Sequence, residues 1–218
     1  MIHTDLGTMP YGEAWAYQQQ LFDEAIRRKS EGKDVENNFL IVEHPHTLTM
    51  GKHAHETNLL FNEQYLNAKG VSLFYIDRGG DVTYHGPGQV VGYPIFDLES
   101  YHIGLRAYIN LVEEAIIRLL DKYGIAASRL DGAAGVWLDV DNPARTRKIA
   151  AIGVRCSRFV TMHGFALNVN TDLSYFNLIN PCGFVDKGVT SMKQELGKDI
   201  DIEQIKKELF DTFETLFV

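Results

Sequence analysis

Cys182 and Lys148 are the two residues whose types and settings suggest covalent chemistry. Cys182 lies in Asn-Pro-Cys-Gly, residues 180–183, where turn-forming neighbours display a thiol rather than pack it. Lys148 opens Lys-Ile-Ala-Ala-Ile-Gly, residues 148–153. A nearby ammonium would hold the thiol as thiolate, the form that attacks carbonyls and thioesters. The alternative is that Cys182 is a small buried apolar residue, as most free cysteines are.

A glycine-rich segment, residues 78–89, follows a predicted strand. It reads Arg-Gly-Gly-Asp-Val-Thr-Tyr-His-Gly-Pro-Gly-Gln, and its glycines permit close approach of backbone to a ligand. No Gly-Lys-Ser/Thr closes it, and its glycine spacing differs from that of a dinucleotide fingerprint. The segment therefore favours a ligand-binding loop of another kind, or a plain turn.

Residues 163–168, His-Gly-Phe-Ala-Leu-Asn, combine small residues with a histidine and an asparagine. On a strand, Gly164 and Ala166 would share one face and leave room for a slim ligand such as an acyl chain. A helix packed against that face is the alternative.

Four histidines invite comparison with a metal site. They are His44, His46, His53 and His55. Their spacing does not match that of zinc sites, and no carboxylate or cysteine in their neighbourhood completes a ligand set. We expect no metal and assign these histidines no role.

The composition is that of a folded domain in a reducing compartment. The 218 residues are 45% hydrophobic and 23% charged, which suits one sizeable core. No apolar run approaches the roughly 18 residues of a membrane span, and we expect neither a signal peptide nor membrane binding. Two cysteines make no disulfide framework, so we expect free thiols and a cytoplasmic location. A net charge of −8 argues against nucleic-acid binding.

The charge distribution is uneven. Residues 142–171 contain no Asp or Glu but five cations: Arg145, Arg147, Lys148, Arg155 and Arg158. A locally basic face on an acidic protein suits an anionic ligand or an acidic partner. The alternative is a solvated strand edge that carries protective charges.

Hydrophobic periodicity predicts helices and strands in an irregular order. Helices are predicted at residues 11–28, 105–123 and 202–216, and strands at 38–43, 71–76, 90–98, 135–140, 149–156 and 159–168. Only Ser157 and Arg158 separate the last two strands, which predicts a hairpin. Short connections imply antiparallel pairing. We therefore predict one α/β (α+β) domain over residues 1–218, with a mixed, largely antiparallel sheet flanked by helices.

Four segments in this order resemble the lipoyl(octanoyl) transferase family: residues 78–89, 148–153, 163–168 and 181–183. The similarity covers residues 3–217, and four ordered motifs are far more specific than one glycine loop. The resemblance implies transfer of an octanoyl group from octanoyl-acyl carrier protein to a lysine of a lipoyl domain, without a cofactor. It also implies the fold of biotin and lipoate protein ligase catalytic domains. The acceptors would be 2-oxoacid dehydrogenases or the glycine cleavage H protein.

The resemblance also implies roles for individual residues. Cys182 would carry the octanoyl thioester, and Lys148 would tune the cysteine. The acyl-binding residues would be Arg78, Gly79, Gly80, Asp81, Val82, Thr83, Tyr84, His85, Ala151, Ile152, Gly153, Gly164, Phe165 and Ala166.

Two other functions are compatible with the same scaffold. An ATP-dependent lipoate or biotin ligase forms an acyl-adenylate and needs no nucleophilic cysteine. A catalytically inactive module could bind carrier or lipoyl domains. The presence of both Cys182 and Lys148 disfavours these two alternatives.

Overall fold

Two sheets form the framework of the protein. The computed structural model describes residues 1–180 and 188–218. The main sheet has the order β1-β2-β6-β10-β9-β8-β7, and β11 pairs with β9 beside this path. Its strands are β1 (Ile2–Thr8), β2 (Asn38–Glu43), β6 (Gln89–Ile95), β10 (Val160–Asn168), β9 (Arg147–Ser157), β8 (Ala133–Leu138), β7 (Ser128–Leu130) and β11 (Gly188–Val189). The smaller sheet has the order β4 (Ser72–Tyr75), β3 (Thr47–Met50), β5 (Val82–His85).

The pairing confirms a mixed, largely antiparallel sheet. From β2 through β6, β10, β9 and β8 to β7, every neighbouring pair is antiparallel. The pairs β1–β2, β11–β9 and β3–β4 are parallel. That the chain forms a single domain stays a prediction.

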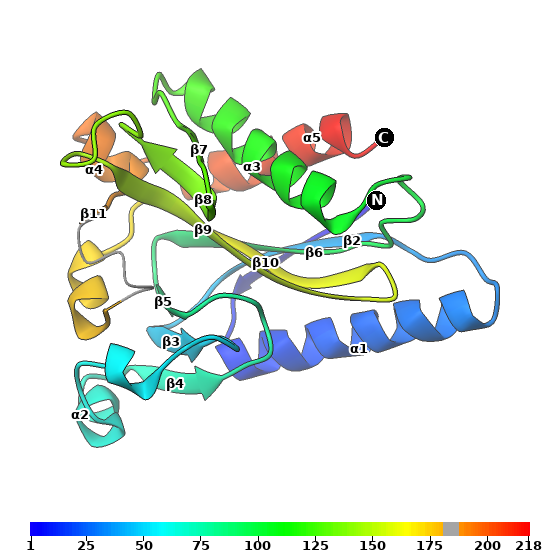
Figure 1. Ribbon diagram of the computed structural model, residues 1–218, viewed down its shortest axis with the longest axis horizontal. Helices are drawn as coiled ribbons and strands as arrows, with labels where there is room; N and C mark the ends of the chain where they lie inside the picture. The colour runs from blue at the N-terminus through cyan, green and yellow to red at the C-terminus, as the bar shows by residue number, and fades with distance from the viewer. Residues whose placement is uncertain (181–187) are drawn as a thin grey trace.

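Helices cover both faces of the main sheet (Figure 1). Helix α1 (Tyr11–Ser30) lies on one face, and α3 (Leu105–Lys122) and α5 (Ile202–Leu216) lie on the other. Pro10 is the N-cap of α1, two residues after β1 ends at Thr8. The remaining helices are the α-helices α2 (Glu63–Ala68) and α4 (Met192–Leu196), and the 3₁₀ helices η1 (Glu56–Asn58) and η2 (Leu173–Leu178).

The larger core lies between the sheet and α3 and α5. Phe213 of α5 is fully buried, and its ring centroid is 4.1 Å from that of Phe39 and 5.7 Å from that of Phe165. Phe165 also lines the cavity described below, so this aromatic cluster supports one wall of the site. None of the helices in residues 1–180 and 188–218 has the length and apolar character that a membrane span requires.

The predicted hairpin is present, with its turn one residue later than expected. Ser157 pairs with Val160, so Arg158 and Phe159 form the loop. Both have positive φ, 50° and 63°. A two-residue loop with both φ positive matches the right-handed twist of the strands. Neither residue is the Gly or Asn that usually signals such a turn.

One segment predicted to be a loop contains a strand. Residues 82–85, inside the glycine-rich segment, form β5, which pairs with β3. Val82, Thr83 and Tyr84 favour strands, but the surrounding glycines dominated the prediction. Strands β1 and β3 were also missed.

The aromatic cluster predicts a large packing effect at Phe213. We expect Phe213→Ala to lower the free energy of unfolding by about 3–5 kcal/mol, because it opens a cavity inside the core. Phe61→Ala is the control, since Phe61 is 39% exposed. Urea denaturation of both variants measures the difference. Equal losses would contradict the assignment of Phe213 to the main core.

Candidate active site

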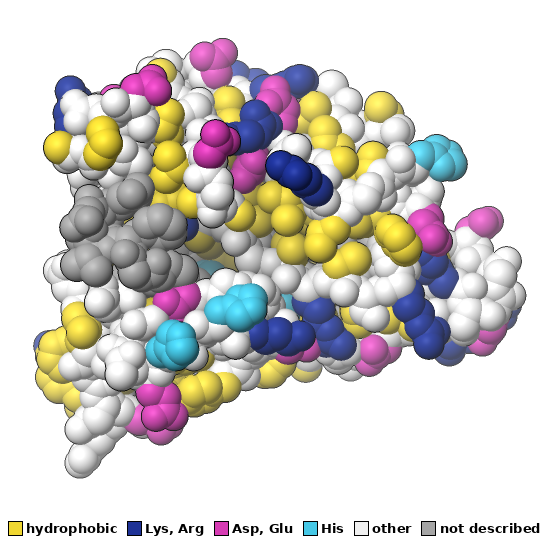
Figure 2. Space-filling model, in the orientation of Figure 1, with side chains coloured by type: hydrophobic (Ala, Val, Ile, Leu, Met, Phe, Trp, Pro, Cys, Tyr) yellow, Lys and Arg dark blue, Asp and Glu magenta, His cyan; other side chains and the backbone are white. Residues whose placement is uncertain are grey.

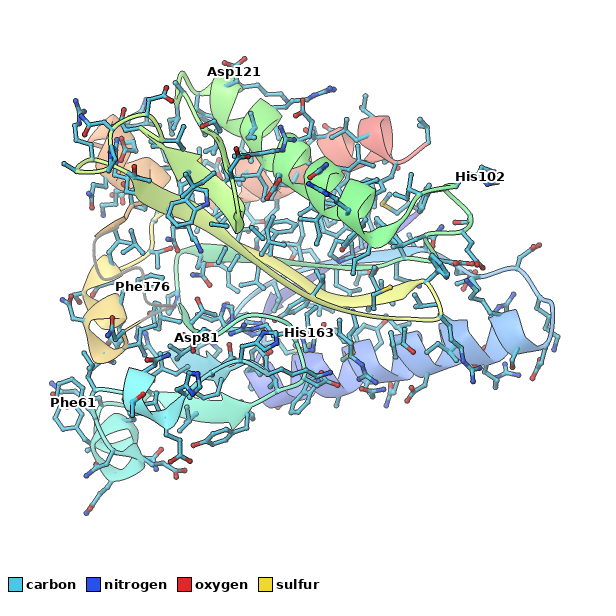
Figure 3. All side chains as sticks on the ribbon, viewed as in Figure 1. Phe61, Asp81, His102, Asp121, His163 and Phe176 are labelled. Carbon is cyan, nitrogen blue, oxygen red and sulfur yellow. The ribbon has the colours of Figure 1, made fainter. Side chains whose placement is uncertain are left out.

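A cavity of about 490 Å³ lies among β5, β9, β10 and the residues before β5. This volume is typical of small-molecule sites. Figure 2 shows a hollow on this face, with hydrophobic side chains along one side of it. Asp81 and His163 lie between the elements of the two sheets in Figure 3, whereas Phe61 lies at an outer corner.

The structure brings most of the predicted site residues to this cavity. Its lining includes Lys148 and all the expected acyl-binding residues except Tyr84: Arg78, Gly79, Gly80, Asp81, Val82, Thr83, His85, Ala151, Ile152, Gly153, Gly164, Phe165 and Ala166. Cys182 lies outside the described residues. Successive strand residues point to opposite faces, so Thr83 and His85 face the cavity. Tyr84 packs into the smaller sheet's own core and contacts His46, with 2.7 Å between its hydroxyl oxygen and Nδ1.

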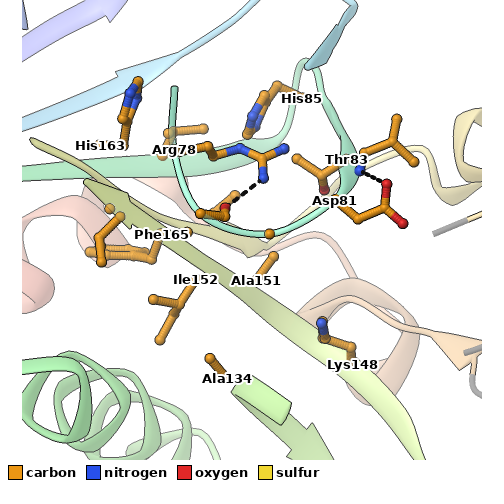
Figure 4. A pocket seen from close by; sticks show the side chains of 18 of the residues that line it. Arg78, Asp81, Thr83, His85, Ala134, Lys148, Ala151, Ile152, His163 and Phe165 are labelled. Atoms are coloured by element: carbon orange, nitrogen blue, oxygen red, sulfur yellow. Dashed lines mark hydrogen bonds between the residues drawn. The ribbon is translucent and has the colours of Figure 1, made fainter. Parts of the chain in front are cut away.

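Residues 77–81 connect β4 to β5, both in the smaller sheet, and on the way cross the space beside β9, where they are bonded to both sheets. The Gly79 N–H donates to Val154 O of β9 at 2.9 Å. The Arg78 guanidinium is 8% exposed and donates to Thr49 O and Oγ1, each at 2.9 Å, and to Gly79 O at 3.0 Å. Figure 4 shows this last bond at one end of the arch that the segment makes over the cavity. A buried cation is tolerated only with such partners, and the segment is correspondingly fixed.

Two glycines permit this crossing. A Cβ on Gly51 would lie 2.4 Å from Gly80 O, and one on Gly153 would lie 2.9 Å from Gly79 O. Both contacts are with backbone, which cannot move aside. Gly164 was expected to leave room for a ligand, but the structure gives a different reason for a glycine at this position. Its Cβ would lie 2.2 Å from Gly92 O, so glycine is required there by the neighbouring strand.

Asp77, at the start of the crossing, binds two residues of the main sheet. The Nε2–H of His163 donates to Asp77 Oδ1 at 2.9 Å, and Arg155 pairs with Oδ2. The bond from His163 lowers the pKa of Asp77, with the charge of Arg155 adding to it. Burial lowers the pKa of His163, so a neutral imidazole donates to a carboxylate. His163 is also strained, with a φ of 59°.

These ion pairs correct the expectation of a basic face. Arg155 is neutralised by Asp77, and Arg147 binds Glu195 with two bonds of 2.7 and 2.6 Å and also pairs with Asp139. The carboxylates come from outside residues 142–171, so the local sequence did not reveal them.

An irregularity in β9 presents Lys148 to the cavity. Val136 pairs with Ala150 and Trp137 with Lys148, so Ile149 has no partner on β8. Such a bulge re-aims side chains. Lys148 and Ala151 consequently both line the cavity, although regular alternation would put them on opposite faces. The Lys148 ammonium lies 4.4 Å from the centroid of the Trp137 ring, a cation–π geometry.

Strand β11 joins Lys148 to the segment that contains the predicted nucleophile. Val189 pairs with Lys148, and the Thr190 N–H donates to Lys148 O at 2.9 Å. Val189 is seven residues after Cys182. Phe176 of η2, on the other side of Cys182 in sequence, also lines the cavity.

The histidines of residues 44–55 have separate environments. His44 is fully buried: its Nδ1–H donates to Met9 O at 2.8 Å, and its Nε2 accepts from the Tyr93 hydroxyl at 2.7 Å. His46 contacts Tyr84, and His53 and His55 are exposed. Among the residues that the structure describes, no three His, Cys, Asp or Glu side chains gather as a metal site would require.

The sequence analysis missed one wall of the cavity. Leu105 and Ile109 of α3, the turn at residues 132–134 and Trp137 all belong to the lining. The periodicity of α3 indicated a helix packed on the core, and it is one. No sequence signal separates these residues from ordinary core positions; the structure shows the second role of α3 through Leu105, a large apolar residue in the first turn that is 39% exposed.

The chain matches the family model of the lipoyl protein ligase A/B catalytic domain over residues 10–214. It belongs to this family. The octanoyltransferase of Bacteroides fragilis (strain YCH46) is 53% identical over 208 residues, which cover 95% of this chain and 94% of the relative. The octanoyltransferase of Parabacteroides distasonis is 54% identical over 213 residues, covering 98% and 96% of the two chains.

Among solved structures, the bi-partite lipoate protein ligase system of Thermoplasma acidophilum, with its E2 lipoyl domain, shares the fold. The superposition has a TM-score of 0.70 at 17% identity and covers 99% of this chain and 82% of the other. The expected ligase-like fold is therefore confirmed.

The buried histidines predict a pH-dependent stability. Burial lowers the pKa of His44 to about 4 and that of His85 to about 3. Below about pH 6.5 the unfolded chain takes up protons that these folded imidazoles do not. Stability contributed by the neutral histidines is thus complete above pH 6.5 and is lost progressively as the pH falls toward 4. Each histidine contributes roughly 1.4 kcal/mol per pH unit.

Chemical denaturation between pH 7.5 and 4.5 measures this slope. His44→Gln should make the slope shallower, whereas His102→Asn, at an exposed position, should leave it unchanged. An unchanged slope in His44→Gln would show that folding does not lower the pKa of His44.

Proposed function

We propose that this protein transfers an octanoyl group from octanoyl-acyl carrier protein to a lysine of a lipoyl domain, through a thioester on Cys182. The observation that carries the proposal is Lys148 in a largely apolar cavity, on a strand paired with Val189. Relatives more than 50% identical over nearly the whole chain are named octanoyltransferases. The specific acceptor and a cytoplasmic location stay predictions from the sequence.

The acceptor lysine sets the chemical problem. Its pKa near 10.4 makes the neutral amine scarce at pH 7 by about 3.4 units, or roughly 4.6 kcal/mol. An ammonium cannot attack a thioester, so the site must remove a proton. The first half of the reaction also needs a proton, for the departing thiol.

Lys148 can supply both proton transfers. Cys182 thiolate attacks the octanoyl thioester, and Lys148 ammonium protonates the departing pantetheine thiolate. Neutral Lys148 then takes one proton from the acceptor ammonium, and the amine that results attacks acyl-Cys182. The second proton of the acceptor nitrogen passes to solvent as the amide forms. Cys182 leaves as thiolate, and the original ion pair is restored.

The proton transfers matter more in this scheme than activation of the thiol. Lowering a cysteine pKa from about 8.5 to about 7 raises the thiolate fraction from roughly 3% to 50%. Lower basicity reduces its nucleophilicity by about fivefold, with a Brønsted slope near 0.45. The net gain is a few-fold, whereas general acid–base catalysis typically contributes about 10² to 10⁴.

The cavity also bears on the ATP-dependent alternative. Within the described part of its lining, Asp81 is the sole carboxylate. Asp81 Oδ1 accepts from the Val82 N–H at 2.7 Å, and Oδ2 accepts from Asn58 Nδ2 at 2.6 Å. A carboxylate held in this way is poorly suited to bind the Mg²⁺ that accompanies ATP. The transfer should therefore proceed without added ATP.

The nucleophile can be tested by intact mass. Incubation with octanoyl-acyl carrier protein should add one octanoyl group to the wild type and none to Cys182→Ala. Cys156→Ala is the matched control, since Cys156 lies half-buried in β9 and burial raises the pKa of its thiol. An adduct on Cys156, or one that survives in Cys182→Ala, would refute the assignment.

The proton-transfer role of Lys148 predicts a specific defect in Lys148→Arg. Arginine keeps the positive charge but does not release a proton at working pH. The variant should form some acyl-enzyme and then stall before transfer to the acceptor. Higher pH should restore part of the second step, because more acceptor amine becomes neutral.

Single-turnover measurements separate the two steps. Slower acylation with normal deacylation would instead show that Lys148 chiefly stabilises the thiolate.

A further inference from the structure

A second cavity continues from the active-site cavity along α3. It has a volume of about 520 Å³ and is lined by Leu105, Arg106, Ile109, Asn110, Glu113, Arg129 and residues 130–134. Leu105, Ile109 and residues 132–134 line both cavities. We call this second cavity the α3 groove. Neither the resemblance nor the proposed function assigns it a role.

We infer that the α3 groove holds the phosphopantetheine arm of the donor carrier protein. This inference rests on the proposed function, because it places the second half of the same thioester. The carbonyl carbon of a thioester bears two branches, the acyl chain and the thiol. If the carbon is attacked beside Lys148, the two branches must leave that point in different directions.

The acyl branch and the groove lie on different sides of the cavity. Figure 4 shows Arg78, His85 and His163, from the expected acyl-binding segments or next to them, on one side of Ala151 and Ile152. Ala134 lies on the other side, as does Lys148. Ala134 belongs to both cavities, so the route from Lys148 past Ala134 leads into the groove. The thiol branch can follow this route while the acyl chain occupies the side of the cavity that holds Arg78, His85 and His163.

One wall of the groove is held in place by a buried carboxylate. Glu113 is 5% exposed, and its Oε1 accepts the Gly135 N–H at 3.0 Å while Oε2 accepts Arg129 Nε at 3.1 Å. Arg129 also donates to Asn110 O at 2.8 Å. These bonds tie the β7–β8 hairpin to α3, so the groove exists before a ligand arrives and costs little ordering on binding.

The charge of the groove suits a ligand with one anionic end. Arg129 is committed to Glu113 and Glu114, but Arg106 makes no ion pair within residues 1–180 and 188–218. Apolar Leu105 and Ile109 lie nearer the active-site cavity, since they line both. A pantetheine arm has this order: a thioester end with short alkyl and amide groups, then a phosphodiester. Asp131 is the opposing charge in the lining.

This inference can be tested with four donors. All four carry the octanoyl group, and they differ in the thiol to which it is attached. They are octanoyl-N-acetylcysteamine, octanoyl-pantetheine, octanoyl-phosphopantetheine and octanoyl-acyl carrier protein. The measurement is kcat/KM for formation of the acyl-enzyme, by rapid quench and intact mass. Asn110→Trp fills the groove at a position that lines only the groove. It should slow the three pantetheine donors about tenfold relative to octanoyl-N-acetylcysteamine, a difference of about 1.4 kcal/mol.

Charge variants test the anionic end independently of groove filling. Arg106→Glu should lower kcat/KM for octanoyl-phosphopantetheine and for octanoyl-acyl carrier protein relative to kcat/KM for octanoyl-pantetheine. Asp131→Asn should raise the same ratio of kcat/KM values. Lys122→Glu, at the far end of α3, makes the same charge change as Arg106→Glu and should leave the ratio unaltered. Thermal unfolding of each variant checks that the fold is retained.

The outcomes separate this inference from the proposed function. If Asn110→Trp and Arg106→Glu leave all donor ratios at the wild-type values, the arm does not lie in the groove. If kcat/KM falls for octanoyl-acyl carrier protein alone, and not for the small pantetheine donors, these residues contact the carrier's surface instead. If the unaltered protein forms no acyl-enzyme from any donor, the proposed function itself fails.

Discussion

The site depends on one constraint, the contact between the backbones of the two sheets. Residues 77–81 pass between the end of β3 and the free edge of β9 with no room for a side chain at Gly51 or Gly153. The Gly79 N–H to Val154 O bond and the Arg78 bonds to Thr49 fix this crossing. Because backbone atoms of residues 79 and 80 are the neighbours of Gly51 and Gly153, a side chain at either glycine would push the two sheets apart. The cavity is the space that this spacing leaves.

The same crossing explains why so many polar groups lie beside a largely apolar cavity. A segment buried between sheets must satisfy its charges locally, and Asp77 and Arg78 do so with His163, Arg155 and Thr49. His85 donates to Gln89, which in turn donates to Asn168 at 2.9 Å. These groups are occupied with one another, so the lining can contain them and still offer a largely apolar surface to a saturated chain.

Local patterns predicted α3, the β9–β10 hairpin and several strands, among them β2, although both partners of β2 are distant in sequence. Strand β2 was predicted at its observed bounds, and α3 and the β9–β10 hairpin to within a few residues. The missed strands β3 and β5 have four residues each, too few for periodicity to carry a signal, and the seven residues of β1 show no clear alternation of apolar and polar side chains. The basic character of residues 142–171 was real in sequence, but Asp77 and Glu195, far along the chain, cancel much of it. Long-range pairing is what single-sequence reasoning lacks.

The site residues also depend on contacts that a single sequence does not reveal. Motifs identified Lys148 and the glycine segment, but the bulge at Ile149, which aims Lys148 into the cavity, depends on the register of β8 against β9. Leu105 and Ile109 looked like ordinary core residues of an amphipathic helix. With Ala134 they line both the active-site cavity and the α3 groove. Under the proposed function such a continuation of the cavity is needed, because the acyl group must stay in the site while the thiol departs.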